Sequence, residues 1–217
     1  MSYTGNVIEG GPPDVRTLDD LVITKLSVRP TDNNTYLLRC RRTGDGLLID
    51  AANEPDRLLE LIDDGELSTV VTTHQHQDHW FALKDVVEQT GARSIAHAAD
   101  AVALPVVHDT VADGDVIQVG DCSLEVIHLV GHTPGSIALL YRDAGGIPHL
   151  FTGDSLFPGG VGGTWGNAAN FASLINDVEH KIFDRLPDET WFYPGHGKDS
   201  TLGAERPALP EWRARGW

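Results

Sequence analysis

The sequence predicts an α/β fold in which two β-sheets carry helices on their outer faces. Short aliphatic and β-branched runs alternate with amphipathic helical segments through both halves of the chain. No low-complexity stretch, strong linker or short-period repeat interrupts this alternation. A chain of 217 residues has the length of one large domain, so we expect a single domain over residues 1–217.

The first half supplies strands that end at turn residues and helices that have one apolar face. The expected strands cover residues 21–28, 35–40, 46–50 and 68–74. Residues 54–65 place three leucines and an isoleucine on one helical face. Residues 80–91 form a second amphipathic segment, which ends at Gly91.

The second half repeats this alternation. The expected strands cover residues 94–97, 115–120, 122–129, 136–142 and 149–154. A helix with an asparagine cap is expected over residues 170–186, and a last strand within residues 189–197. Polar residues follow several of these strands directly, and loops that leave one edge of a rigid sheet are where sites usually form. We therefore expect a site at one sheet edge.

The chain is strongly acidic, with 32 Asp and Glu against 16 Lys and Arg and a net charge of −16. Such a surface repels phosphate backbones and anionic lipids, so neither nucleic acid nor a membrane is expected as a partner. The two cysteines, Cys40 and Cys122, lack any short spacing and fit reduced thiols. No signal peptide is visible, and no apolar run approaches the roughly 20 residues of a spanning helix. We expect a soluble, cytoplasmic protein.

Residues 73–80 read THQHQDHW, a dense cluster of imidazoles directly after an expected buried strand. In an extended segment residues two apart point to the same side, so His74, His76 and Asp78 are expected to project together. His79 would then point to a neighbouring position. Neutral imidazole and carboxylate are ligands that suit zinc, iron or manganese. A histidine-rich surface turn is the alternative, and the position after a buried strand favours a metal site.

Three later segments place a further candidate ligand in a tight loop or at a strand end. VGHTPGS contains His132, FTGDSLF contains Asp154 and YPGHGKD contains His196. Each residue alone could be an ordinary loop histidine or a turn aspartate. Together with the cluster, and in this order, they predict one metal centre. The other five histidines are expected to be ordinary polar groups; they are His97, His108, His128, His149 and His180.

With these motifs in this order, the chain resembles the metallo-β-lactamase-fold hydrolase superfamily over nearly its whole length. The resemblance implies a four-layer αβ/βα sandwich, with two mixed sheets flanked by helices and a two-metal site at one sheet edge. It implies that Asp154 bridges the metals and that Asp50 orients a ligand histidine, although Asp50 could instead cap the helix that begins near Glu54. The implied ligands are His74, His76 and His132 for the first metal, and Asp78, His79 and His196 for the second.

The chemistry of such a centre follows from its ligands. Two divalent ions, zinc in the first place with iron or manganese as alternatives, lower the pKa of a shared water and supply a metal-bound hydroxide. The same ions stabilise the oxyanion that forms on attack. Asp78 is the expected catalytic residue, because it can orient the attacking water or take its proton.

Within the superfamily, GHTPGSIAL, TGDSLF and YPGHG are most similar to the glyoxalase II branch, which hydrolyses S-(2-hydroxyacyl) thioesters. The short C-terminal end resembles short bacterial hydroxyacylglutathione hydrolase-like members. Two departures concern the substrate: the usual DHxxGG becomes DHWFAL, and residues 157–170 contain no Arg or Lys to meet a glutathione carboxylate. We therefore expect a small-molecule thioester or ester substrate. Trp80, Trp165 and Tyr193 are candidates to line its pocket, or they are ordinary core or rim aromatics.

Other readings of the superfamily motif stay open. A zinc β-lactamase is disfavoured because Asp154 stands where the most familiar group has cysteine, and a nuclease is disfavoured by the acidity. A persulfide dioxygenase has the same fold with one Fe(II) held by two His and an Asp, and it is the alternative enzyme. A non-enzymatic metal-binding interaction module is the alternative from another class. The complete ligand set, including His79 and His196, favours the hydrolase. The oligomeric state is left open.

Overall fold

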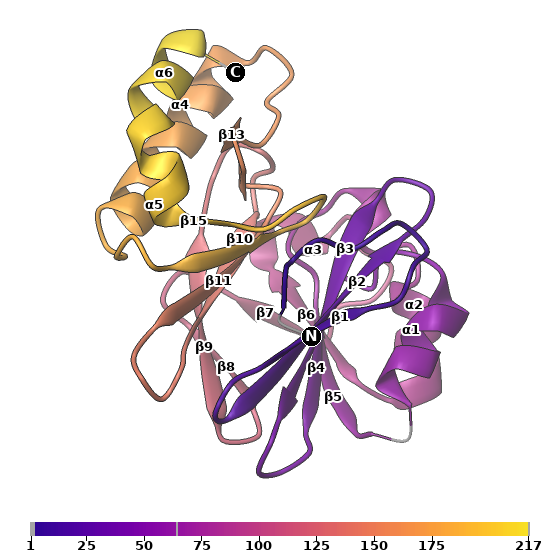
Figure 1. The fold of residues 1–217 in the computed structure, drawn as a ribbon. Helices are drawn as coiled ribbons and strands as arrows, with labels where there is room; N and C mark the ends of the chain where they lie inside the picture. Colours follow the sequence, from indigo (N-terminus) through magenta and orange to yellow (C-terminus); the bar gives the residue numbers. More distant parts are fainter. Residues whose placement is uncertain (1–2, 64, 217) are drawn as a thin grey trace.

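Two mixed β-sheets pack face to face, and helices cover the outer face of each sheet (Figure 1). The structure is a computed structural model that describes residues 3–63 and 65–216. The arrangement confirms the predicted α/β fold with two sheets flanked by helices.

The first sheet is antiparallel from β1 to β4 and parallel from β4 to β7. Its strands lie in chain order: β1 (Asp14–Thr17), β2 (Leu21–Val28), β3 (Asn33–Cys40), β4 (Gly46–Ile49), β5 (Leu67–Val71), β6 (Arg93–His97) and β7 (Asp109–Val111). Because the carboxyl ends of parallel strands meet at one edge, the residues after β4 and β5 lie close together. Asp50 and the histidine cluster follow these two strands.

The second sheet has the order β15-β14-β11-β10-β9-β8. Its strands are β8 (Val116–Val119), β9 (Cys122–His128), β10 (Ile137–Arg142), β11 (Pro148–Gly153), β14 (Trp191–Pro194) and β15 (Ser200–Thr201). β11 and β14 are parallel neighbours, so Asp154 and His196, which follow them, lie at the same edge. A short hairpin, β12 (Leu156–Phe157) with β13 (Gly160–Val161), follows Asp154.

The helices lie outside the two sheets, with α1 and α2 beside the first and α4 and α6 beside the second (Figure 1). They are α1 (Pro55–Ile62), α2 (Leu83–Thr90), α3 (Ala98–Ala101), α4 (Ala168–Asp177), α5 (Leu202–Glu205) and α6 (Leu209–Arg215). A π-helical segment, Val178–Phe183, extends α4, and 3₁₀ turns occupy Gln77–His79 and Arg206–Ala208.

Three apolar cores separate the four layers. Leu38 and Phe151 lie in the core between the sheets. Leu58 of α1 belongs to the core under the first sheet, and Trp212 of α6 to the core under the second. Burial of each such side chain contributes about 1.5–3 kcal/mol, so the cores hold the sheet edges rigid beneath the loops that follow them.

Several predicted boundaries differ from the structure. β5 ends at Val71, so the chain leaves the sheet before His74. The long helix begins at Ala168 rather than at residue 170, because the Asn167 side chain accepts hydrogen bonds from the N–H groups of Ala169 and Asn170. β1 and β7 are short, and they were not predicted because neither contains an aliphatic run.

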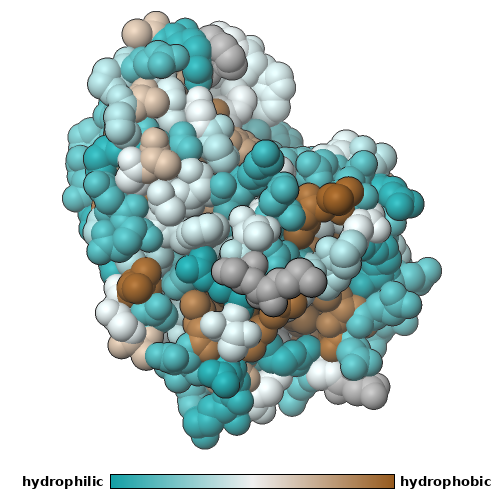
Figure 2. Space-filling model, viewed as in Figure 1, coloured by the Kyte–Doolittle hydropathy of each residue, from teal (hydrophilic) through white to brown (hydrophobic). Residues whose placement is uncertain are grey.

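The viewed face of the molecule is mainly hydrophilic, with a few separate hydrophobic patches (Figure 2). Over residues 3–63 and 65–216, no helix combines the length and the apolar composition needed to cross a membrane.

Candidate metal centre

All seven predicted ligand residues lie together at one edge of the two sheets. The first triad consists of His74, His76 and His132, and the second triad consists of Asp78, His79 and His196. Within each triad the candidate ligand atoms lie within 4.8 Å of one another. His74 and His79 also form such a group with Asp154. Loops from both sheets therefore build the centre.

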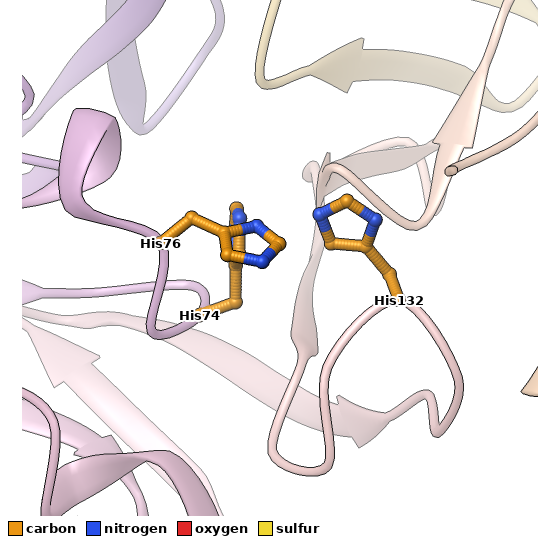
Figure 3. A group of neighbouring side chains, drawn as sticks. All are labelled: His74, His76 and His132. Atoms are coloured by element: carbon orange, nitrogen blue, oxygen red, sulfur yellow. The ribbon is translucent and has the colours of Figure 1, made fainter. Parts of the chain in front are cut away.

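The first triad joins two rings of the histidine cluster to a ring from the β9–β10 loop. The three rings turn toward one another (Figure 3), with centroids 4.7 Å apart for His74 and His76, and 4.8 Å apart for His74 and His132. The outer nitrogens have partners, because Nδ1 of His74 lies 3.1 Å from the Thr73 hydroxyl and Nδ1 of His132 lies 2.9 Å from the carbonyl of Gly163. The Nε2 atoms of both histidines are thus left to face inward.

The second triad depends on a local turn that the sequence did not reveal. The 3₁₀ turn Gln77–His79 interrupts the extended course of the cluster. Asp78 therefore lies with His79 and His196, as the resemblance implied, whereas the extended spacing alone had predicted that it projects together with His74 and His76. Its Oδ2 lies 3.4 Å from Nε2 of His196 and 3.6 Å from Nε2 of His79.

Asp154 lies between the two triads. Its Oδ1 is 3.4 Å from Nε2 of His79, and its Oδ2 is 3.5 Å from Nε2 of His196 and 3.7 Å from Nε2 of His132. Gly195 makes this approach feasible, since a Cβ at that position would overlap the Asp154 carboxylate. One carboxylate therefore faces ring nitrogens of both triads.

The first-triad histidines are uncharged at neutral pH. Burial lowers the pKa of His74 well below its usual value, because a charged imidazole loses its hydration there. Burial likewise lowers the pKa of His76 and of His132, although Asp154 acts in the opposite direction. Neutral imidazole is the form that binds a metal ion.

The second triad has the opposite electrostatics. Burial acts to lower the pKa of His79, but the carboxylates of Asp154 and Asp50 outweigh it and raise the pKa well above the usual value. Burial also opposes protonation of His196, yet hydrogen bonds to Asp154 and Asp78 raise its pKa to about 10. The hydrogen bond from His196 is the main cause of a strongly lowered pKa of Asp78. This triad holds protons near neutral pH.

Unpaired buried atoms test whether the residues fit a metal ion. Over the described residues, Nε2 of His74, Nε2 of His132 and Oδ1 of Asp154 are buried and make no hydrogen bond. Asp154 Oδ1 has only the longer ion-pair contact with His79. Because buried polar atoms are rarely left unpaired, this donor set fits a bound cation.

The second triad instead surrounds an amide. Nδ2 of the buried Asn33 lies 3.0 Å from Oδ2 of Asp78, 3.3 Å from Nε2 of His196 and 3.4 Å from Nε2 of His79. Nδ2 can donate to the Asp78 carboxylate, but it cannot donate to the two ring nitrogens while they carry protons. Asn33 lies at the start of β3, far from the motifs, and no sequence pattern singled it out.

Asp50 lies behind the second triad. Its Oδ2 is 2.8 Å from Nδ1 of His79 and accepts a hydrogen bond from the Thr73 hydroxyl, and its Oδ1 accepts one from the Thr73 N–H. The structure thus places Asp50 against a candidate ligand. It does not cap α1, whose N-cap residue is Glu54.

Asp100, which the sequence did not single out, joins the loops of the first triad. Its buried carboxylate accepts hydrogen bonds from the N–H groups of Gln75 (2.9 Å) and Gly135 (2.7 Å), and from the Thr133 hydroxyl (2.5 Å). Gln75 lies inside the histidine cluster and Thr133 follows His132. One side chain therefore fixes both loops.

A buried ion pair supports the loop of the second triad. Lys25 Nζ lies 2.6 Å from Oδ1 of Asp199 and donates to the carbonyls of Gly197 (2.7 Å) and Gly5 (2.8 Å). Gly197 directly follows His196. A buried pair of this kind is costly to break, because the remaining charge would lack a partner. The pair holds the His196 loop against β2.

The three predicted pocket aromatics lie in different environments. Trp165 is 72 % exposed, and its ring centroid lies 5.2 Å from that of His76. Trp80 is half-buried and donates a hydrogen bond to the Gln75 carbonyl. Tyr193 is fully buried in the core between the sheets, stacked on Phe151. The structure therefore brings Trp165 to the centre but leaves Tyr193 outside it.

The five other histidines belong to none of the candidate metal groups among the described residues. His149 is buried, with Nδ1 2.9 Å from the Tyr193 hydroxyl. His97 accepts a hydrogen bond from an N–H of α3 and stacks on His128. These contacts agree with the expectation that they are ordinary polar groups.

The chain is similar in sequence to proteins of known family. The hydroxyacylglutathione hydrolase of Polaromonas sp. is 36% identical over 166 residues, which are 76% of this chain and 62% of that protein. The matched part of the chain thus spans less than two thirds of that relative's length.

The fold is also found in solved structures, among them the following two. ETHE1 from Myxococcus xanthus has a TM-score of 0.75 and 31% identity, covering 88% of this chain and 84% of that one. TTHA1623 in a di-iron-bound form has a TM-score of 0.68 and 30% identity, covering 84% of this chain and 96% of that one. The model of the metallo-beta-lactamase superfamily matches residues 28–196. The chain is therefore a member of the metallo-beta-lactamase superfamily.

Proposed function

We propose that the protein is a metal-dependent hydrolase of a small-molecule thioester, such as an S-(2-hydroxyacyl) thiol. The observation that carries the proposal is the position of Asp154, whose carboxylate lies within 3.4–3.7 Å of ring nitrogens from both triads. The relative named hydroxyacylglutathione hydrolase and the neighbour in a di-iron-bound form support it.

In this proposal each triad would hold one divalent ion, with zinc as the first choice. His74, His76 and His132 would hold one ion, Asp78, His79 and His196 would hold the other, and Asp154 would contribute its carboxylate as a further ligand. Bound ions of this kind supply Lewis acidity, which lowers the pKa of water toward neutrality and polarises a carbonyl.

The chain's own residues orient the nucleophile. The Asp78 side chain is 38% exposed, and its lowered pKa keeps it ionised. It can therefore accept a hydrogen bond from the attacking water and orient it. Asp50 fixes the ring of His79 by accepting a hydrogen bond from Nδ1.

The proposal also covers the setting of the reaction. The free, buried Cys40 and Cys122 suit a reducing compartment, so we include a cytoplasmic location and one domain over residues 1–217. The net charge of −16 disfavours nucleic acid as a substrate.

The test is to incubate metal-loaded protein with a panel of thioesters and to measure hydrolysis as the release of free thiol. We expect cleavage by the wild type, and loss of cleavage together with metal in Asp154→Ala. Glu189→Ala is the matched control, since it removes an exposed acid in the loop before β14 and should change neither property. Full activity of Asp154→Ala would contradict the proposal.

A second candidate is a mononuclear iron persulfide dioxygenase. Among the seven candidate ligand residues, the buried atoms without hydrogen bonds come from two histidines and one aspartate, which is the ligand set of that enzyme class. Iron near one ion per chain, with oxygen uptake on a persulfide and no thioester cleavage, would favour this candidate over the hydrolase.

A further inference from the structure

The loop after Asp154 lies directly on the candidate metal centre. A Cβ at Gly162 would overlap the Asp154 carbonyl and lie 3.0 Å from Nδ1 of His132. The next residue, Gly163, offers its carbonyl to the same Nδ1 at 2.9 Å. Only glycine permits such a close approach, and it brings Trp165, two residues further on, to the rim of the centre.

Trp165 contacts two rings of the first triad but is barely covered. Its ring centroid lies 5.2 Å from that of His76 at an interplanar angle of 85°, and 5.3 Å from that of His132 at 34°. The residue is 72% exposed. An indole in this state gains little from burial, so packing does not account for it.

The backbone of Trp165 is also unfavourable. The N–H of Asn167 donates to the Thr164 carbonyl at 2.9 Å, which closes a four-residue turn. Both central residues have positive φ, 50° for Trp165 and 75° for Gly166. Turns of this kind favour Asn, Asp or Gly, because a bulky side chain is strained at positive φ. Exposure and strain together indicate a residue placed for function rather than stability.

We propose that Trp165 sets the substrate specificity by contacting an uncharged, apolar and planar group next to the scissile bond. This inference rests on the proposed hydrolase function. Residues 157–170 contain no Lys or Arg, so the loop that carries Trp165 offers no cation to pair with an anionic group of the substrate. The same loop supplies Phe157, whose ring centroid lies 6.4 Å from that of His196.

The apolar group can belong to the acyl part or to the leaving thiol, and two substrate series separate these cases. The first series changes acetyl to phenylacetyl on one thiol, and the second changes methanethiol to benzyl thiol under one acyl group. For each substrate, kcat/KM of a metal-loaded variant is divided by that of the wild type. Intrinsic differences in thioester reactivity cancel in this ratio.

Two variants separate the effect of the Trp165 aromatic ring from the effect of its strained backbone. Trp165→Asn removes the ring and relieves the turn, whereas Trp165→Phe keeps an aromatic ring at positive φ. We expect Trp165→Asn to lose about 5–10-fold more kcat/KM on the aromatic member than on the small member of one series. We expect its Tm to rise by about 2–4 °C. Trp165→Phe should keep most of the discrimination without the gain in Tm.

Ile147→Ala is the control, because it trims an apolar side chain in the turn between β10 and β11, at the far end of these strands from the centre. For this control, kcat/KM divided by that of the wild type should be the same for all substrates of both series. If the kcat/KM ratio of Trp165→Asn to wild type is equal for all substrates of both series, or if this variant has a lower Tm, the inference about Trp165 is overturned while the proposed function stands. A wild type that cleaves no member of either series would overturn the proposed function and, with it, the inference.

Discussion

The two triads of the metal centre use the same kinds of side chain, but their surroundings differ. Burial lowers the pKa of His74 and His132 in the first triad and leaves their Nε2 atoms without partners. In the second triad carboxylates raise the pKa of His79 and His196, and the Asn33 amide lies within 3.0–3.4 Å of all three side chains. The Nε2 atoms of the first triad are therefore free to bind a cation. In the second triad, protons on the histidines and the Asn33 amide already occupy the ligand atoms.

This contrast has a consequence for metal binding. An ion at the first triad displaces neither a proton nor a hydrogen bond, whereas an ion at the second must displace both. We therefore expect unequal affinities, with the first triad filled before the second. The supports are separate as well, because Asp100 fixes the loops of the first triad and the Lys25–Asp199 pair fixes the loop of the second.

The largest expected effect is the loss of one ligand from each triad. His132→Ala should lose the tight ion and reduce thioester cleavage by at least about 100-fold, since even partners of ligands contribute 10–100-fold. His196→Ala should keep the tight ion and lose only the weaker one. Metal analysis after dialysis, with cleavage rates, measures both.

His180→Ala is the control for these ligand variants, because His180 lies on the π-helical extension of α4 and belongs to neither triad. Equal metal loss from the His132 and His196 variants would contradict an unequal pair of sites.

A smaller effect is expected when the amide is removed from the second triad. Asn33→Ala should raise the affinity of the second ion by about 10-fold, since a hydrogen bond to a charged group contributes about 1.5–3 kcal/mol that the ion no longer has to displace. Competition titration with a chelating dye measures the two affinities, and Asn6→Ala, an exposed asparagine, is the control. Weaker binding of the second ion would instead mean that Asn33 supports the site.

The smallest effect concerns protons. At pH 7 the second-triad histidines carry protons in the metal-free protein, because the pKa of His196 is raised to about 10 and that of His79 is also raised. The second ion should therefore release about one to two protons, and the first should release none. Calorimetric titration in two buffers with different ionisation enthalpies counts them. If only the first ion to bind released protons, the order in which the two triads fill would be the reverse of the one predicted.

The sequence was sufficient to locate those site residues whose residue type and loop position determine their chemistry. The cluster at residues 74–79, with His132, Asp154 and His196, could be located because each member follows a strand or lies in a tight loop. For Asp78 the spacing alone predicted the wrong neighbours, because the 3₁₀ turn Gln77–His79 changes its direction, whereas the resemblance correctly grouped it with His79 and His196.

Other features of the centre depend on contacts between distant parts of the chain. Asp100 acts on residues 25–35 positions away, and Lys25 on Asp199 across 174 positions. Asn33 meets His196 across 163 positions. No local pattern encodes such pairs. The full burial of Tyr193 likewise arises from the packing of two sheets, so its residue type could not reveal it.

The most direct test of the two-site account is a zinc titration of the metal-free protein at pH 7, with the metal content measured independently. The account predicts two ions per chain in two resolved steps, a tight first step without proton release and a weaker second step with it. Binding that saturates at one ion per chain, or two ions bound in a single step of equal affinity, would contradict it.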